Sequence, residues 1–355
     1  MKSEEIAKIA GVSRSTVSRV INNYSNVPDE TKKKVLDIIA KYNYQPNTSA
    51  RVLAGKQNDT IGLFIVSIAD TDNPNRLYNN NYFTQFVDAV VECANSRGYY
   101  VLVNIIYCEG DYNRVSEIFL QKRIDGGIVI GTEKDADALI NISKKGYPVA
   151  LIDYDVNEIT GRNLQNDNLI VIGSKDYEGA VAAIEYLIEL GHRDIGFLAG
   201  RLSTYSGRQR YEAYFDTMKK YGLEVNNEFV LHGDFLKSKT KAELTKLIAK
   251  GKLPSAIFSS NDDMAITAMD LFKEKNIRVP EDISIIGFDN IPLSSLIRPA
   301  LSTVSTPVYD MVDKTVAELI SHIKRNERGF TSSRYDTKII IRETCQRKQG
   351  TEIIP

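Results

Sequence analysis

The chain opens on a stretch, residues 3–22, that reads SEEIAKIAGVSRSTVSRVIN. Residues 3–10 place apolar side chains on one face at helical spacing, and Gly11 then interrupts the helix. Ser13 suits the N-cap of a second helix, which is polar and contains Arg19. Two short helices joined by a tight glycine turn are typical of a helix-turn-helix, whose second helix enters the major groove of DNA. This stretch therefore predicts a DNA-binding head.

The charges of the chain are distributed unevenly. Residues 1–60 contain ten Lys and Arg against six Asp and Glu, whereas the remainder contains 35 against 40. A basic head on a mildly acidic body binds phosphate at one end and repels it elsewhere. The net charge of -1 for the whole chain therefore does not argue against DNA binding.

The length and composition limit the class of protein. A chain of 355 residues is expected to form two or three domains. No apolar run is long enough to span a membrane, and the charged N-terminus lacks the apolar region of a signal peptide. The three cysteines, Cys93, Cys108 and Cys345, are too few for a disulfide framework. These features predict a cytoplasmic protein with reduced thiols and no membrane partner.

Two helical segments are expected after the helix-turn-helix. A third helix should run from about Asp29 to Lys41, with Pro28 at its start. The next segment has room for about eight helical residues between a possible N-cap, Asn47, and Gly55. Because an isolated helix of that length is not stable in water, we expect a linker that folds only when a partner holds it.

From Thr60 onward, apolar runs of strand length alternate with helical stretches. The expected strands are Ile61–Val66, Tyr100–Ile106, Ile124–Ile130, Pro148–Ile152, Ile195–Leu198, Ala256–Phe258 and Ile283–Ile286. This alternation indicates βαβ units with helices on both faces of a parallel sheet. The strands are more than one open sheet usually holds, so we expect two doubly wound lobes with ligand sites at the strand ends and between the lobes.

Sequence blocks along the whole chain resemble the LacI/GalR (lactose-repressor) family of bacterial transcriptional regulators. The blocks in the head and linker are Ile6–Ser13, Thr16–Asn22, Tyr44–Asn47 and Ala50–Leu53. The blocks in the core are Leu190–Ile195, Asn261–Asp262, Val279–Ser284 and Gly287–Asp289. A helix-turn-helix alone is moderately specific, whereas these blocks in this order and spacing are highly specific.

The resemblance implies an α/β fold with an N-terminal all-α helix-turn-helix head and two doubly wound parallel-sheet lobes of the periplasmic-binding-protein type. The head would take residues 1–45, a hinge helix and linker 46–59, the core 60–345 and a tail 346–355. The first lobe would take about 60–164 and 293–328, and the second about 165–292 and 330–345, which includes a C-terminal strand near Lys338–Arg342. Three strands would cross between the lobes. The C-terminus lacks the leucine heptads of tetrameric members, so a homodimer is expected.

The resemblance assigns DNA contacts to the second helix. Arg14 and Ser15 stand where the family reads bases, and Arg19 resembles a further base-contacting position. Arg14 suits a bidentate contact with a guanine edge, or else it contacts phosphate or solvent. Three further residues match the family's phosphate contacts, which position the head without reading sequence: Thr16, Ser18 and Asn22.

The hinge is assigned a second set of DNA contacts. The resemblance suggests that the hinge helices of a dimer enter the minor groove together, where Leu53 of each chain would wedge into the central base step. Asn47 and Arg51 belong to the same DNA-binding segment. The two-fold symmetry of such a dimer predicts a pseudo-palindromic operator in double-stranded DNA.

The resemblance also assigns an effector site between the lobes. Its residues are Tyr82, Phe83, Asp153, Arg208, Phe235, Asn261 and Asp289. Carboxylates, a guanidinium and an amide provide the donors and acceptors that vicinal hydroxyls need, and an aromatic face covers the apolar side of a sugar ring. The expected effector is therefore a small saccharide, and no cofactor or metal is expected. Alternatively, Asn261 or Asp289 caps a following turn or helix, and Tyr82 or Phe83 belongs to the core.

The function implied is a repressor of carbohydrate-utilisation genes that is controlled allosterically by its effector and has no enzyme activity. No G-x-S-x-G, P-loop or H-E-x-x-H motif is present. Three alternatives stay open: a nucleobase as the effector, a phosphoprotein as corepressor, and a sugar-binding protein without gene regulation. The polar stretch Ala69–Asn81 departs from the commoner family pattern and either rims the effector site or forms a surface loop.

Overall fold

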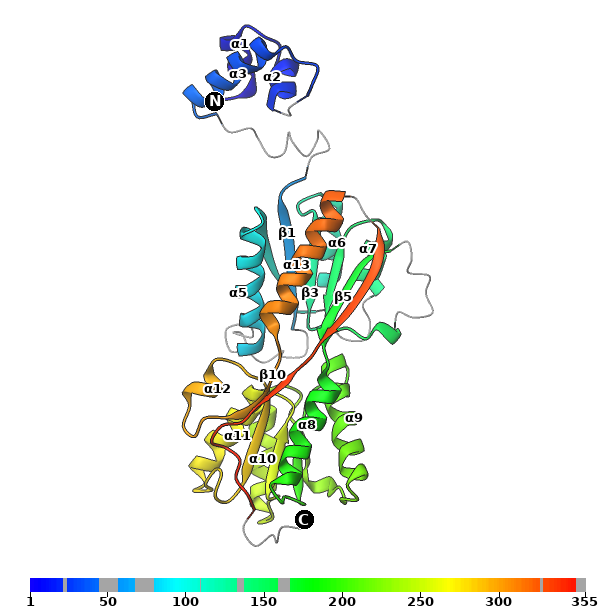
Figure 1. Ribbon diagram of the computed structural model, residues 1–355, viewed down its shortest axis with the longest axis vertical. Helices are drawn as coiled ribbons and strands as arrows, with labels where there is room; N and C mark the ends of the chain where they lie inside the picture. Colours follow the sequence, from blue (N-terminus) through cyan, green and yellow to red (C-terminus); the bar gives the residue numbers. More distant parts are fainter. Residues whose placement is uncertain are drawn as a thin grey trace. The chain divides into compact units, whose positions relative to one another are not determined.

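The computed structural model describes residues 1–21, 24–44, 57–67, 80–108, 110–132, 137–158, 167–325 and 328–348. The chain divides into two compact units, Met1–Asn58 and Asp59–Pro355. Over the described residues, the first unit is all-α and the second is α/β (Figure 1).

The first unit contains the predicted helix-turn-helix and the third helix. These are α1 (Ser3–Ala10), α2 (Arg14–Ile21) and α3 (Asp29–Lys41). Gly11 ends α1 in the left-handed conformation, with φ 65°, and the Thr16 N–H donates to Ser13 Oγ at 3.1 Å. The helices enclose a small core of Ile6, Ala7, Ala10, Val17, Val20, Val27, Val35 and Tyr44. The predicted helical fold of the head is therefore confirmed.

The first lobe of the second unit contains, among its described residues, a six-stranded sheet in which all pairings are parallel. Its strands in spatial order are β11 (Gly329–Tyr335), β5 (Asn168–Ser174), β4 (Val149–Ile152), β3 (Gly126–Ile130), β1 (Thr60–Val66) and β2 (Tyr100–Ile106). One face is covered by α5 (Asn81–Asn95) and α13 (Val308–Arg325), and the other by α6 (Asp111–Leu120) and α7 (Asp137–Lys144). The inner strands read as continuous apolar runs because both of their faces are buried.

The second lobe is built in the same way. Over the described part of the chain its sheet also has six strands, parallel except for the pairing of β12 with β10. The order is β12 (Lys338–Ile340), β10 (Ser302–Ser305), β9 (Ser284–Asp289), β8 (Ala256–Ser259), β6 (Ile195–Ala199) and β7 (Val230–His232). One face is covered by α8 (Asp176–Glu189) and α9 (Tyr205–Lys220), and the other by α10 (Lys237–Ala249) and α11 (Asp262–Glu274). Among the short elements, η2 (Asn227–Phe229) and α12 (Leu293–Leu296) belong to this lobe, whereas η1 (Val156–Glu158) follows β4 of the first lobe.

Within the described residues the chain crosses between the lobes three times: from β5 to α8, from β10 to α13 and from β11 to β12. Figure 1 shows these crossings where the two lobes meet. The predicted lobe boundaries were wrong at these points, because β5 and β11 belong to the first lobe and β10 to the second. Strand β5 pairs in register with β4 and β11, so it completes the first sheet before the chain crosses.

Four strands were not among those expected from the sequence: β5, β7, β10 and β11. An apolar run indicates a strand, but the sheet that the strand joins depends on residues far away in the chain. The fold class is nevertheless as predicted, a helical head followed by two parallel-sheet lobes. Among the described helices, none is both long enough and apolar enough to cross a bilayer.

The second lobe depends on a stack of aromatic rings, which leads to a stability prediction. The Phe197 side chain is fully buried, and its ring centroid lies 4.7 Å from that of Tyr214 and 5.5 Å from that of Phe258. We expect Phe197→Ala to lower the free energy of unfolding by about 3–5 kcal/mol, because it removes these contacts and leaves a cavity. Urea unfolding followed by circular dichroism measures the loss. The control Tyr221→Phe removes a hydroxyl whose only described hydrogen bond, to Glu185 at 3.0 Å, is exposed, and it should change the unfolding free energy by less than about 0.5 kcal/mol. Equal unfolding midpoints for Phe197→Ala and the control would contradict the assignment.

Candidate DNA-binding head and effector cavity

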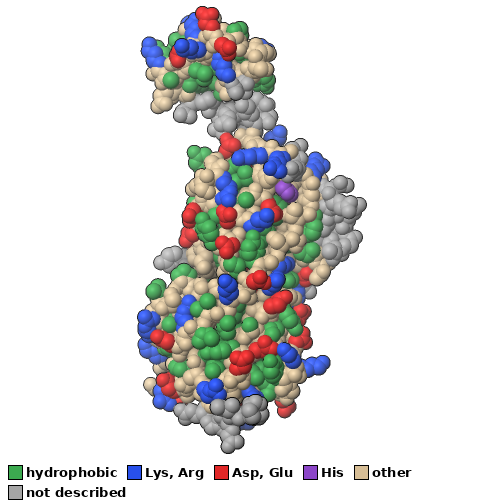
Figure 2. Space-filling model, viewed as in Figure 1, with side chains coloured by type: hydrophobic (Ala, Val, Ile, Leu, Met, Phe, Trp, Pro, Cys, Tyr) green, Lys and Arg blue, Asp and Glu red, His purple; other side chains and the backbone are tan. Residues whose placement is uncertain are grey.

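Helix α2 exposes the side chains that were expected to contact DNA. Its exposed residues include Arg14, Ser15, Ser18 and Arg19, and Thr16 is half-buried. Arg14 Nη1 lies 3.2 Å from Glu4 Oε1, with both side chains about two-thirds exposed. Because such an exposed pair contributes little to stability, Arg14 can exchange Glu4 for another acceptor at small cost. Figure 2 shows Lys and Arg side chains spread over the visible face of this unit together with Asp and Glu.

Four of the expected DNA contacts lie outside the described residues: Asn22, Asn47, Arg51 and Leu53. Residues 69–79 of the polar stretch also lie outside them. The roles assigned to these residues stay predictions.

A cavity of about 460 Å³ lies between the two lobes. It is lined by residues that follow the carboxyl ends of β1, β3 and β4 in the first lobe and of β6, β8 and β9 in the second. Six of the seven residues expected to bind an effector line it: Tyr82, Phe83, Asp153, Phe235, Asn261 and Asp289. The volume falls within the range of about 300–1,000 Å³ that is usual for small-molecule sites.

The seventh expected residue, Arg208, does not line the cavity. Its Nη2 lies 3.3 Å from Asp155 Oδ2, and its Nη1 donates to the carbonyl of Ser203 at 3.2 Å. Arg210, two residues further along α9, lines the cavity instead. Of this pair, Arg210 rather than the expected Arg208 therefore lines the cavity.

The pattern of α9 contains the signal that would have found Arg210. The buried positions of this helix recur every three or four residues, and they are Gly207, Arg210, Ala213, Tyr214, Thr217 and Met218. An arginine on an otherwise apolar stripe must find buried partners, because an isolated buried charge is costly. Arg208 lies outside that stripe.

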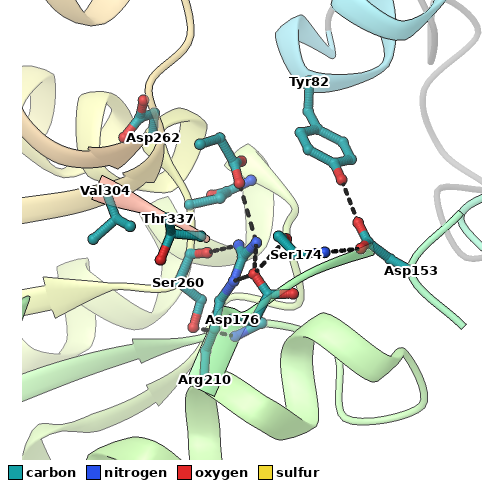
Figure 3. A network of polar contacts seen from close by, with 12 residues as sticks. Tyr82, Asp153, Ser174, Asp176, Arg210, Ser260, Asp262, Val304 and Thr337 are labelled. Carbon is teal, nitrogen blue, oxygen red and sulfur yellow. Dashed lines mark hydrogen bonds and ion pairs between the residues drawn. The ribbon is translucent and has the colours of Figure 1, made fainter. Parts of the chain in front are cut away.

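Arg210 is the centre of a buried polar network (Figure 3). Its Nη2 lies 2.9 Å from Asp176 Oδ1 and 3.2 Å from Asp289 Oδ1, and its Nη1 donates to the carbonyl of Ser260. The guanidinium carbon lies 3.7 Å from the centroid of the Phe288 ring, a cation–π contact. Burial opposes the charge, but Asp176 and Asp289 outweigh it and raise the pKa of Arg210 above its ordinary value. The cavity therefore contains a permanently charged donor in a fixed position.

Asp289 ends β9 and faces the cavity. Burial raises the pKa of its carboxyl well above the ordinary value, although Arg210 acts in the opposite direction. Its Oδ1 lies close to Arg210 but accepts no hydrogen bond from any described residue. An unsatisfied buried acceptor is unfavourable, so a ligand hydroxyl that donates to Asp289 would gain more here than at the surface.

Asp153 faces the cavity from the first lobe, at the end of β4 (Figure 3). The Tyr82 hydroxyl donates to its Oδ2 at 2.7 Å, and the Ser174 N–H donates to its Oδ1 at 3.2 Å. Burial, followed by the charge of Asp176, raises the pKa of Asp153 to about 6. A side chain at Gly173 would not fit, because its Cβ would lie 2.7 Å from Asp153 Oδ1 and 1.8 Å from a nitrogen of Arg334.

Two further cavity residues come from the second lobe. Asn261 Oδ1 accepts from the Met264 N–H at 2.9 Å and so caps α11, while the residue also lines the cavity. The capping interpretation and the cavity interpretation of Asn261 therefore both apply, and the cap uses only the amide oxygen. Phe235 stands directly against Gly200, where an added Cβ would lie 2.1 Å from the ring. Gly200 therefore makes room for the aromatic wall.

The aromatic residues of the first lobe belong to the core and also stand at the cavity. Tyr82 and Phe83 pack against the first-lobe core and line the cavity. Their ring centroids lie 5.9 Å apart, and Tyr82 additionally meets Phe86 at 5.0 Å. Packing against the core fixes the rings, so the cavity wall that they form is rigid.

Besides Arg210, charged cavity residues that the sequence analysis missed are Arg201, Lys237 and Asp263. Each follows a strand end or an expected residue closely, since Arg201 lies two residues after β6 and Asp263 two residues after Asn261. The described residues contain no group of three or more His, Cys, Asp and Glu side chains placed to hold a metal ion. The cavity thus offers hydrogen bonds, charges of both signs and aromatic faces.

The raised pKa of Asp153 predicts a pH dependence of stability. In the unfolded chain an aspartate titrates near pH 4, whereas in the folded protein the pKa of Asp153 is about 6. The folded state holds this proton more tightly, so its stabilising contribution is complete below about pH 4 and is lost as the pH rises through 6. We expect the unfolding free energy of the wild type to fall relative to Asp153→Asn by about 2–3 kcal/mol between about pH 3 and 7. Urea titrations at several pH values measure this difference, and parallel profiles for the two proteins would contradict it.

Comparisons with known proteins agree with this architecture. Residues 4–47 match the family model described as bacterial regulatory proteins, lacI family, and residues 184–345 match the periplasmic binding protein-like domain. The chain is 33% identical over 346 residues to the probable HTH-type transcriptional repressor ExuR of Bacillus subtilis (strain 168), covering 97% of this chain and 98% of that protein. It is 32% identical over 349 residues to the HTH-type transcriptional repressor PurR of Pasteurella multocida (strain Pm70), with coverage of 97% and 98%.

Solved structures show the same fold. The Lac repressor dimer bound to operator and the anti-inducer ONPF matches with a TM-score of 0.79 and 26% identity, over 98% of this chain and 99% of that one. The complex of the transcriptional regulator CelR with cellobiose matches in fold with a TM-score of 0.72 and 23% identity, over 97% and 100%. Given the identity to the repressors over nearly the whole chain, the protein belongs to the lacI family of DNA-binding bacterial regulatory proteins.

Proposed function

We propose that this protein is a transcriptional repressor that binds pseudo-palindromic operator DNA as a homodimer and responds to a small saccharide in the interlobe cavity. One observation carries the proposal: a single chain joins an exposed recognition helix, α2, to a cavity built around Arg210 and Asp289. It would act in the cytoplasm, where operator DNA is found, and by binding without catalysis.

The chemistry of the cavity favours a saccharide. Carboxylates from opposite lobes, Asp153 and Asp289, can accept hydrogen bonds from hydroxyls, and Arg210 can donate to them. Phe83 and Phe235 supply aromatic faces for the apolar side of a sugar ring. A planar nucleobase would use the aromatic faces but leave more of the carboxylate acceptors unsatisfied.

Exposed apolar side chains support the homodimer. Strand β2 is an edge of the first sheet, and its Tyr100 is 73% exposed, with Leu102 and Val103 also exposed. In the second lobe, Leu296 of α12 is 72% exposed. Apolar side chains along an open sheet edge usually mark an interface. The related Lac repressor was solved as a dimer on operator, which supports a second copy of this chain as the occupant.

The proposed head reads DNA through two kinds of contact. Arg14, with Ser15 and Arg19, would contact base edges, while Thr16 and Ser18 would hold the phosphates. The hinge contribution that the family resemblance implies is the wedge of Leu53 in the minor groove.

Effector binding would control operator affinity through the arrangement of the lobes. Strand β1 begins at Thr60, directly after the predicted hinge and linker, residues 46–59. A change in the first lobe would therefore be passed to the chain that leads to the head. Such coupling between two sites is reciprocal and typically amounts to about 1–3 kcal/mol, or roughly 5–150-fold in operator affinity. The sign of the response follows from which lobe arrangement the effector stabilises.

A thermal-shift screen tests the effector class. The purified full chain is heated with monosaccharides, disaccharides, sugar phosphates and nucleobases. A saccharide at a hundredfold excess over its Kd should stabilise the protein by about 2.7 kcal/mol, or roughly 5–10 °C in Tm. Asp289→Asn should abolish the shift, because it removes a charged acceptor from the cavity. The matched control Asp282→Asn changes an exposed aspartate of the second lobe and should retain the shift.

The outcomes of the screen separate the alternatives. A shift by nucleobases alone would overturn the saccharide assignment. A saccharide shift that survives Asp289→Asn would overturn the cavity assignment. If no member of the panel shifts the protein, the proposal of a small saccharide effector is wrong.

Selection of binding sites from random duplexes tests the DNA contacts. We expect the wild type to select a pseudo-palindrome, and Arg14→Ala to lose about 1–3 kcal/mol of discrimination at one base pair of each half-site. Thr16→Ala should instead weaken binding to all sequences alike, because a phosphate contact carries no base information. Fluorescence anisotropy on matched and mismatched duplexes measures both effects. Unchanged base preference in Arg14→Ala would contradict the role of this residue.

A further inference from the structure

A bidentate contact joins the two lobes beside the cavity. Asn81 is the first residue of α5 in the first lobe, and Asp263 lies in the first turn of α11 in the second. The Asn81 backbone N–H donates to Asp263 Oδ2 at 3.2 Å, and the Asn81 side-chain amide donates to Oδ1 at 2.7 Å. Both oxygens of one carboxylate are therefore engaged by one residue of the opposite lobe.

The electrostatic setting of Asp263 strengthens this contact. The carboxylate lies at the N-terminus of its own helix and accepts a first-turn N–H of α5, so it meets the positive ends of two helices. Lys237 Nζ lies 3.1 Å from Oδ1, and the Asp263 side chain is only 7% exposed. A charged acceptor this far removed from water gains more from each donor than an exposed one. Separation of the lobes would take two of the three donors away.

The role of Asn81 is not explained by the stability of α5 alone. Asn80 already supplies the N-cap of this helix, since its Oδ1 accepts from the Phe83 N–H at 3.0 Å. Thr84 closes the same first turn by donating to the Asn81 carbonyl at 3.0 Å. The side-chain amide of Asn81 is instead directed to the other lobe.

A second polar bridge joins the lobes at α9. Arg208 of this helix pairs with Asp155, which follows β4 of the first lobe, at 3.3 Å, and both side chains are only 18% exposed. Nearby, Arg334 of β11 stacks over the Tyr205 ring at 4.1 Å. In Figure 1, α5 and α11 lie on one side of this unit and α9 on the other. Contacts between the lobes are thus present on both sides.

We propose that Asn81 and Asp263 form an interlobe bridge that holds the cavity closed, with Asp155 and Arg208 as its counterpart at α9. Asn81 and Asp263 are positioning residues: they set the fraction of the protein in the closed arrangement, and through it the apparent affinity of any effector that binds only that arrangement. This inference rests on the proposed allosteric function but concerns contacts between protein groups.

Hydrogen–deuterium exchange of the full chain, without added ligand or DNA, tests the bridge. In Asn81→Ala we expect about tenfold faster exchange both at the start of α5 and in residues 234–240 and 261–266 of the second lobe, because opening exposes both walls of the cavity. The matched control Thr84→Ala removes a hydrogen bond from the same turn without touching the second lobe. It should accelerate exchange in α5 alone.

The remaining outcomes are decisive. Acceleration confined to α5 in Asn81→Ala would overturn the proposal, because the residue would then serve only its own helix. If circular dichroism shows that Asn81→Ala does not fold, Asn81→Asp takes its place, because a second carboxylate beside Asp263 should repel it; unchanged exchange in the second lobe would then overturn the bridge. Arg208→Gln tests the counterpart at α9. It should accelerate exchange in residues 153–158 and 203–208, and unchanged exchange in the first lobe would overturn the second bridge. Since no effector is added, failure of this test is independent of failure of the thermal-shift screen.

Discussion

The cavity depends on one buried charge, the guanidinium of Arg210. Three elements of the second lobe converge on it, because Asp176 begins α8, Ser260 follows β8 and Asp289 ends β9. Removing either carboxylate would leave this buried charge with one ionic partner instead of two, and breaking a buried ion pair in this way is costly. The contacts with Arg210 hold the carboxyl ends of β8 and β9 in place, and with them the polar groups that a ligand in the cavity would meet.

The two lobes contribute different chemistry to the cavity. The first lobe supplies Tyr82, Phe83 and a carboxyl, Asp153, whose proton is held until about pH 6. The second supplies Arg210 and Asp289, which are locked by ionic contacts. A ligand that contacts both lobes would therefore meet packed aromatic rings in the first lobe and ion-paired side chains in the second. Such a ligand can discriminate between arrangements of the lobes, which is the requirement for an allosteric effector.

Local sequence patterns were enough to predict the helical head and the class of fold. The cavity arginine and the lobe boundaries depend instead on contacts between residues far apart in the chain. Ser13, Gly11 and the apolar spacing of α1 act within a few residues, so the helix-turn-helix could be placed closely. The choice between Arg208 and Arg210 depends on which face of α9 meets the sheet, which is a property of the tertiary structure. The assignment made from the family resemblance therefore fell two residues away from the arginine that lines the cavity. The lobe to which β5, β10 and β11 belong depends on pairings with strands far away in the chain. The roles of Asn47, Arg51 and Leu53 rest on resemblance alone.

The three crossings between the lobes have a consequence for biosynthesis. The first sheet receives its last strand, β11, only after nearly the whole second lobe has been made, and the second receives β12 directly afterwards. A ribosome-bound nascent chain therefore cannot finish one lobe before it starts the other. Until residues 329–340 emerge, β5 and β10 each stand at an open edge of an incomplete sheet. Completion of both lobes is thus a single late event, which depends on the last strands of the chain.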